Sequence, residues 1–264
     1  CVLLSKVGKA NRFTYRMDYL AGASSVIILY LRIWELLRDD DILIQLSQLG
    51  RIVAKTACRL QREENANSDD SFPAGAGHGL EGISVALWRL YAAVGDTEFA
   101  DDAQKIWEKA MAKHKAQPVR SSRERGKWCR GTVGLLWAQN EIDRCTAYGR
   151  RFFDDAGKPF PEFSSVKQLI DSCDWVDDSL CHGRSGAIDV LVSLARNTND
   201  ERYSALARHL MDDMVAAASC NKHFDFGKVS AFPNMSVFLG PLGVAYAMLR
   251  VQNPDVPSLL SLEI

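Results

Sequence analysis

The chain has 264 residues, of which 47% are hydrophobic and 25% charged, a composition typical of globular proteins that excludes collagen-like and wholly disordered chains. Its 32 basic and 33 acidic residues give a net charge of −1, so no overall positive field attracts nucleic acid or an anionic membrane surface. The most apolar stretch, residues 26–31, ends at Arg32, far short of the ~20 residues of a membrane span. We therefore expect one globular domain over residues 1–264 and no membrane span.

The cysteines indicate a reducing compartment. Their number is odd, they are widely spaced and they form no CxxC motif, at positions 1, 58, 129, 145, 173, 181 and 220. This usage favours free thiols and a cytoplasmic location over a disulfide scaffold. The first residue is Cys1 rather than methionine, and no signal region follows it. We therefore expect the chain to be part of a longer polypeptide, whose N-terminal portion is missing from this sequence.

A repeat organises the chain. The pattern Gly-x-x-Gly, followed at once by an apolar run with helical spacing, occurs four times, and a degenerate copy precedes these four. The copies begin at Gly22 (with Ser25 in the second place), Gly79, Gly131, Gly183 and Gly240, so that successive copies are 57, 52, 52 and 57 residues apart. Periods of this length are typical of repeated supersecondary units.

Each copy predicts a helical hairpin. In the second copy, apolar residues from Ile83 to Tyr91 recur at helical spacing, and Gly95 and Asp96 predict a turn. A second amphipathic helix is then predicted over 99–110. Similar turn residues recur at 39–41, 197–200 and 253–257. No stretch alternates with period two for long enough to predict a sheet, so the expected fold is all-α.

Stacked helical hairpins form either an open solenoid or a closed ring. The paired small residues favour the ring, because they lie on one face of the first helical turn and let neighbouring helix starts crowd together. The predicted fold is therefore an α/α toroid, or barrel, of five repeats. The chemistry is expected at the end where the helix starts converge.

The residues just before each first glycine differ between the copies. Cys129 and Cys181 occupy the same place in adjacent repeats, His182 follows one of them, and His78 lies in the preceding repeat. Two thiolates and one imidazole form a zinc ligand set that leaves a fourth, tetrahedral position open, as in catalytic sites. A single Cys or His is more often a packing residue; the shared register favours ligands. The remaining cysteines, and His114, His209 and His223, lack this register and are expected in packing or surface positions.

These motifs resemble those of the lanthionine synthetase C-like cyclases. The segments 128–131 (WCRG) and 179–183 (SLCHG) are similar to the two zinc-ligand motifs of that family, and 77–79 (GHG) is similar to its His-Gly motif. The segments 240–246 (GPLGVAY) and 253–260 (NPDVPSLL) resemble the C-terminus of the bifunctional class II lanthipeptide synthetases. The resemblance extends from about Met17 to Glu263.

The resemblance implies an α/α toroid with Zn²⁺ bound by Cys129, Cys181 and His182. It implies that His78 is the acid/base residue and that Arg125 and Asp18 are active-site residues. Arg125 is alternatively part of a solvated charged loop, and Asp18 alternatively a helix cap. Family members have seven hairpins, so five indicate that the first part of the ring is missing, together with the dehydratase domain that class II enzymes place upstream in the same polypeptide.

The implied reaction is addition of a peptide cysteine thiolate to dehydroalanine or dehydrobutyrine in a lanthipeptide precursor peptide, which closes a thioether ring. Two other functions remain open. Some α/α toroids are glycosidases, which use paired carboxylates rather than zinc. The chain is alternatively a non-catalytic or truncated binding module that keeps its metal ligands. Neither nucleic acid nor a membrane is expected as a partner.

Overall fold

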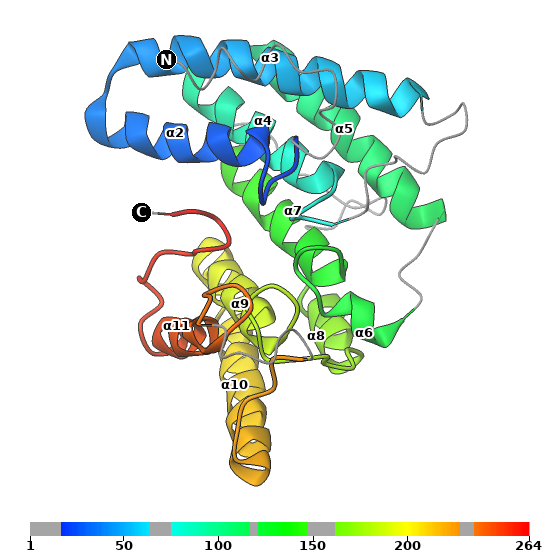
Figure 1. The fold of residues 1–264 in the computed structure, drawn as a ribbon, viewed down its shortest axis with the longest axis vertical. Coiled ribbons are helices and arrows are strands. Elements are labelled where there is room, and N and C mark those ends of the chain that lie inside the picture. Colours follow the sequence, from blue (N-terminus) through cyan, green and yellow to red (C-terminus); the bar gives the residue numbers. More distant parts are fainter. Residues whose placement is uncertain (1–16, 64–74, 117–120, 147–161, 228–234, 264) are drawn as a thin grey trace. The chain divides into compact units, whose positions relative to one another are not determined.

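The computed structural model describes residues 17–63, 75–116, 121–146, 162–227 and 235–263; Cys1 lies outside them. Within these ranges all regular secondary structure is helical (Figure 1). The helices are α2 (Ala23–Leu37), α3 (Asp40–Glu63), α4 (Leu80–Val94), α5 (Thr97–Ala116), α6 (Ser122–Arg125), α7 (Thr132–Thr146), α8 (Phe163–Asp171), α9 (Arg184–Thr198), α10 (Glu201–Asn221) and α11 (Pro241–Gln252). The predicted all-α fold class is confirmed.

The five repeat glycines mark the five expected helix starts. The first helix of every copy begins one residue after the first glycine, namely α2, α4, α7, α9 and α11. Four of these glycines are N-cap residues with extended backbone, at φ between −107° and −138°, and none of the four caps the helix with a side chain. The backbone, rather than a capping hydroxyl or carboxylate, therefore shapes the start of these helices.

Three of the copies are complete hairpins, α2–α3, α4–α5 and α9–α10, joined where the sequence predicted turns. Each first helix ends at a residue in the left-handed conformation, and the next residue is an aspartate whose side chain accepts a hydrogen bond from the backbone N–H two residues on. The left-handed residues are Arg38, Gly95 and Asn199, and the aspartates are Asp39, Asp96 and Asp200. The same local chemistry thus closes all three hairpins.

Two segments differ from the predicted pattern. After α11, residues 253–263 form turns rather than a second helix, and Pro254 and Pro257 interrupt this segment. Proline lacks a backbone donor and disfavours a helical conformation in the residue before it. The charged stretch before Cys129 contains the one-turn helix α6, whose N-cap Ser121 accepts a hydrogen bond from the Arg123 N–H.

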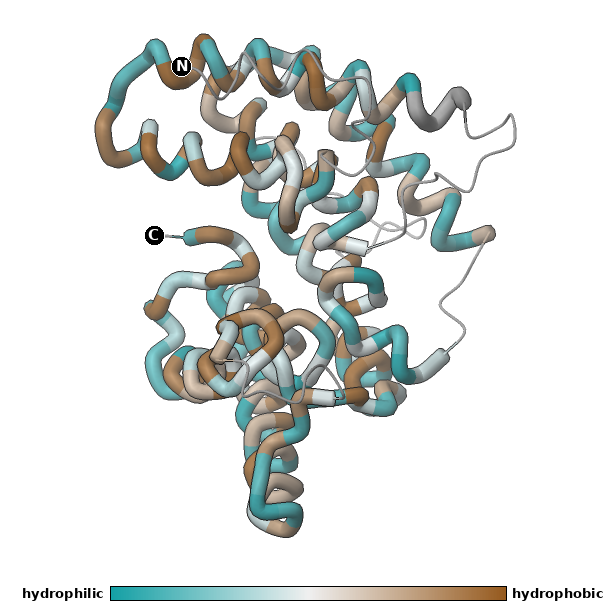
Figure 2. Tube along the Cα trace, viewed as in Figure 1, coloured by the Kyte–Doolittle hydropathy of each residue, from teal (hydrophilic) through white to brown (hydrophobic). Residues whose placement is uncertain are grey.

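The chain divides into two compact units, residues 1–118 with 145–149, and residues 119–144 with 150–264. In the first unit α4 packs against α2, α3 and α5; in the second, α9 packs against α10 and α11. Every residue from Ser185 to Leu194 of α9 is buried, whereas α10 buries one face. In the first unit, hydrophilic and hydrophobic residues alternate along α3, as expected of a helix with one buried face (Figure 2).

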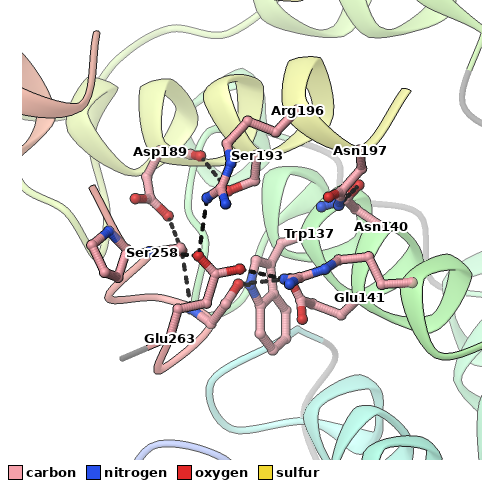
Figure 3. Close-up of polar contacts among 12 residues, drawn as sticks. Trp137, Asn140, Glu141, Asp189, Ser193, Arg196, Asn197, Ser258 and Glu263 are labelled. Carbon is pink, nitrogen blue, oxygen red and sulfur yellow. Dashed lines mark hydrogen bonds and ion pairs between the residues drawn. The ribbon is translucent and has the colours of Figure 1, made fainter. Parts of the chain in front are cut away.

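A buried polar network connects the C-terminal segment to α7 and α9 (Figure 3), and it extends to Tyr246 and Arg250 on α11. The Arg250 guanidinium, fully buried on α11, donates to Asp189 Oδ1 at 2.6 Å and to Ser193 Oγ at 3.1 Å. Asp189 Oδ2 accepts from Ser258 Oγ at 2.8 Å, and Asp189 Oδ1 also accepts from the Tyr246 hydroxyl at 2.8 Å. The two buried charges therefore neutralise each other inside a hydrogen-bonded shell.

A second part of this network holds the last residues of the chain. Glu263 accepts from the Ser258 N–H at 2.9 Å and forms ion pairs with Arg196, at 3.2 Å, and with Arg144. Ser261 Oγ donates to Glu141 Oε1 at 2.7 Å and accepts from the Trp137 indole at 3.0 Å. Residues 258–263 are thereby fixed to α7 and α9.

Candidate metal centre

Backbone hydrogen bonds join the turns that precede neighbouring helix starts. In the second unit, the N–H of Trp128 donates to the Cys181 carbonyl at 3.0 Å, and the Cys181 N–H donates to the Phe238 carbonyl at 3.0 Å. In the first unit, the Leu20 N–H donates to the Gly77 carbonyl at 3.0 Å. Within each unit the turns before the helices therefore lie side by side.

The second glycine of the repeat is required by a close backbone contact. A Cβ atom added at Gly82, Gly186 or Gly243 would lie 2.1–2.2 Å from the carbonyl oxygen of the residue six positions earlier. Contacts this short are excluded for real Cβ atoms, so only glycine lets the turn fold back onto the helix. Ser25 is the exception, and its hydroxyl donates to the Gly22 carbonyl instead. The glycine spacing thus indicates a tight turn before each helix, and this turn positions residues such as Cys181 and His182.

The predicted metal ligands lie together. One potential ligand atom from each of Cys129, Cys181 and His182 lies within 4.8 Å of the others. Ligands on a tetrahedral zinc ion, at about 2.0–2.3 Å from the metal, lie roughly 3.5–3.8 Å apart. The donors are therefore close to the spacing that zinc requires. Both cysteines are buried, whereas the imidazole is 31% exposed, so the cluster has one side open to solvent.

The cluster favours protonated side chains when it holds no metal. A hydrogen bond to Cys129 and burial raise the pKa of the Cys181 thiol well above its ordinary value. The hydrogen bond to Cys129 also raises the pKa of His182, against the effect of burial. A metal that binds here must displace protons, as is usual for thiolate sites. The buried sulfur and nitrogen donors suit a borderline-soft ion such as Zn²⁺ rather than Mg²⁺ or Ca²⁺.

Asp18 and His78 form a pair in the first unit. His78 Nδ1 lies 3.1 Å from Asp18 Oδ2, and Asp18 Oδ1 accepts from the Ala21 N–H at 2.7 Å. Asp18 is buried, whereas the His78 side chain is 34% exposed. Asp18 therefore closes a local turn and also orients a histidine that solvent can reach.

Arg125 lies at the end of α6, in the same unit as the cysteine pair. Its guanidinium donates to Ser172 Oγ at 3.4 Å, and its positive charge opposes the effect of burial on Cys173, whose pKa is raised to about 11. Arg125 thus has a defined partner rather than being part of a wholly solvated loop.

Other cysteines and histidines lie outside the cluster. Among the described residues, Cys129, Cys181 and His182 are the one group of three metal-binding side chains. His114 pairs with the buried Glu81 at 2.5 Å, and His209 pairs with Asp213 at 3.7 Å. His114 was expected to be a packing or surface residue; its buried ion-pair partner could not be identified from the repeat register. Asp177, which lies near His182, could not be singled out from the sequence, because the adjacent Asp178 has the same side chain.

Comparison with known proteins places the chain in a family. Residues 3–264 match the family described as lanthionine synthetase C-like protein. The chain belongs to this family. Among solved structures it is similar to one named nisin cyclase, with a TM-score of 0.62 and 14% sequence identity, covering 96% of this chain and 68% of that chain. A search of curated proteins finds no match.

These comparisons bear on the sequence predictions. The expected membership of the lanthionine synthetase C-like family is confirmed. The structural likeness agrees with the expected α/α toroid class and shows a shared fold at low sequence identity. Within the described residues, no helix is both long and apolar enough to span a membrane.

Proposed function

We propose that this lanthionine synthetase C-like chain is a zinc-dependent cyclase that closes thioether rings in a lanthipeptide precursor peptide. The observation that carries the proposal is the convergence of two cysteines and one histidine within 4.8 Å of one another in a chain of this family. Its expected context, the C-terminal cyclase domain of a class II synthetase downstream of a dehydratase domain, is part of the proposal. So is the single domain over residues 1–264.

In this proposal Cys129, Cys181 and His182 would hold Zn²⁺. When bound, the ion supplies a Lewis acid that favours the thiolate form of a substrate cysteine near neutral pH. The substrate sulfur adds to the β-carbon of dehydroalanine or dehydrobutyrine, and a proton is then added at the α-carbon. One C–S bond forms and one C=C bond becomes single, so no oxidant or reductant is needed.

The proposed roles of the other residues are those that the family resemblance implies, and their local contacts support them. His78 exchanges the proton, because its imidazole is accessible and Asp18 orients it through Nδ1. Arg125 stabilises the negative charge that develops on the enolate oxygen. Its present hydrogen bond to Ser172 is long, at 3.4 Å, and therefore weak, which leaves the guanidinium free to contact an anionic intermediate.

Metal analysis tests the ligand set. Purified protein is expected to contain one zinc ion per chain, and Cys129→Ala, Cys181→Ala or His182→Ala should remove it. Cys58→Ala, Cys145→Ala, Cys173→Ala and Cys220→Ala are matched controls that should keep it, since these cysteines lie outside the cluster. Equal zinc loss in both groups would overturn the assignment.

Ring closure tests the chemistry. A peptide with one cysteine and one dehydroalanine is incubated with the chain, and loss of the free thiol is followed by alkylation and mass spectrometry. His78→Asn should keep full zinc content and lower the cyclisation rate by about 10²–10⁴-fold, the usual contribution of a positioned acid or base. Cyclisation at the parental rate would remove His78 from the mechanism. A chain that binds zinc but never closes a ring would be a non-catalytic module.

A further inference from the structure

The aspartate at position 177 lies beside the proposed metal ligand His182. Asp177 Oδ1 accepts from the Ser179 N–H at 2.8 Å, and Ser179 Oγ accepts from the His182 N–H at 3.1 Å. Asp177 Oδ2 lies 4.0 Å from His182 Nδ1. The residues between the aspartate and the histidine thus form a closed turn that holds a carboxylate beside the imidazole.

Gly183 permits this close approach. A Cβ atom at position 183 would lie 2.2 Å from the Asp177 carbonyl oxygen and 2.4 Å from Asp177 Oδ1. The Asp177 side chain is only 3% exposed, so few water molecules solvate its charge. A buried carboxylate requires hydrogen-bond donors or positive charge. The Ser179 N–H supplies one donor, to Oδ1, and the imidazole lies beside the other oxygen, Oδ2.

We propose that Asp177 is a positioning residue that keeps the His182 proton on Nδ1 and so leaves Nε2 as the metal donor. Metal-binding histidines usually donate their second N–H to a carboxylate, a carbonyl or water, which fixes both tautomer and ring orientation. The 4.0 Å separation is an ion-pair distance, longer than a hydrogen bond, and a bridging water or a small ring rotation closes it. This inference rests on the zinc site of the proposed function.

The neighbouring aspartate has different partners and provides a matched control. Asp178 Oδ1 pairs with the Arg184 guanidinium at 2.8 Å, and Asp178 Oδ2 accepts from the Asp225 N–H at 2.8 Å. Both contacts connect parts of the second unit to each other. Asp178 is thus as buried as Asp177, but its partners are Arg184 and the Asp225 backbone, whereas Asp177 lies beside the proposed metal ligand His182.

The test measures zinc affinity by competition between the folded chain and a chromophoric chelator. Asp177→Asn keeps an oxygen that can accept from the Ser179 N–H, but its amide NH₂ would favour the wrong histidine tautomer. It should weaken zinc binding by about 10–100-fold. Asp178→Asn should keep the parental zinc affinity, whatever its effect on thermal stability. Parental affinity in Asp177→Asn would overturn the inference.

A double variant separates positioning from general damage. His182→Cys replaces the imidazole by a thiol, another zinc ligand, so this background keeps three donors. If Asp177 acts through the imidazole, Asp177→Asn should cause no further loss of zinc affinity in a His182→Cys background. An equal loss with and without the imidazole would overturn the inference. If Asp177→Asn does not fold, Asp177→Ser is used, since a serine hydroxyl can accept the same turn bond. A parental chain that binds no zinc would instead refute the proposed function.

Discussion

Two polar regions, one just before helix α9 and one along it, differ in the direction in which their surroundings shift side-chain pKa values. At its start, two thiols and an imidazole converge, and a hydrogen bond within the cluster raises the pKa of both Cys181 and His182. Farther along the helix, Asp189 pairs with the buried Arg250. Glu263 forms ion pairs with Arg144 and Arg196 (Figure 3). Burial alone would raise the pKa of Glu263, but the Ser258 N–H and the guanidinium groups outweigh it and lower the pKa to about 2.

This difference shows how a binding site can be distinguished from a structural network in one small unit. In the network, the protein itself supplies the counter-charge of each ionised group, so no external ligand is needed. In the cluster, the raised pKa values keep a proton on the Cys181 thiol and on the His182 imidazole, and a bound cation would favour loss of both protons. Variants in the network should therefore change the free energy of unfolding, and variants in the cluster should change metal affinity.

The largest effect on stability is expected at Asp189. Asp189→Ala removes the carboxylate that neutralises Arg250 and accepts from Ser258 and Tyr246, and so leaves a fully buried guanidinium unpaired. Breaking a buried ion pair in this way costs about 3–5 kcal/mol. Urea unfolding, followed by circular dichroism, measures the loss. The remaining folded protein should bind zinc at the parental ratio.

Two further variants sharpen this test. Asp189→Ala combined with Arg250→Met should cost less than the sum of the single variants, because no buried charge is then left alone. Cys181→Ala should show the reverse behaviour, with zinc lost and little change in the urea midpoint measured without metal. A loss below about 1 kcal/mol in Asp189→Ala would mean that the network contributes little.

A substitution between the two regions should affect both. Gly186→Ala places a Cβ atom 2.2 Å from the Leu180 carbonyl and must displace the turn that carries Cys181. Overpacking of this kind typically costs about 1–3 kcal/mol, and displacement of a ligand should also weaken zinc binding. Unfolding and chelator competition are measured on the same sample.

The equivalent glycine in the first unit is the control. Gly82→Ala creates the same clash, with the Ala76 carbonyl at 2.1 Å, but its turn carries none of the three proposed ligands. It should lower stability and leave zinc affinity unchanged. If Gly186→Ala keeps parental zinc affinity, the position of the Cys181 turn does not depend on this contact.

The glycine repeat made part of the fold and site predictable from sequence. The second glycine of the repeat makes the same close backbone contact at Gly82, Gly186 and Gly243. The glycine spacing in the sequence places Cys129 and Cys181 in the same register. The same register led to the three donors that cluster in the structure. The glycine pattern thus predicted the helix starts and the three clustered donors, because the turn before each helix determines both.

The C-terminal network was not predictable in this way. Asp189 and Arg250 are 61 residues apart, and Glu141 and Ser261 are 120 apart, with no shared motif. Their pairing depends on how α7, α9, α11 and the last residues pack, which no periodicity encodes. Asp177 and Asp178 illustrate the same point, because adjacent and identical side chains have different partners.

The smallest effect is expected at Glu263, where the pH dependence identifies the cause. A pKa lowered from 4.5 to about 2 corresponds to roughly 3.4 kcal/mol at about 1.4 kcal/mol per unit. Arg144 and Arg196 are about one-third exposed, and screening by water reduces this to about 1–2 kcal/mol. Glu263→Gln should therefore lower the free energy of unfolding by about 1–2 kcal/mol at pH 7.

This contribution must disappear in acid. A depressed carboxylate pKa stabilises the folded state above pH 4.5, and the stabilisation is lost as the pH falls toward 2, where the folded state also binds the proton. Urea unfolding at pH 7, 5 and 3 should show nearly the same difference between parent and Glu263→Gln at pH 7 and 5, and a much smaller difference at pH 3. Glu98→Gln, at a side chain that is 61% exposed, should stay within about 0.5 kcal/mol of the parent at pH 7. A Glu263→Gln effect that is constant across this range would assign the loss to packing rather than to charge, and would remove Glu263 from the electrostatic network.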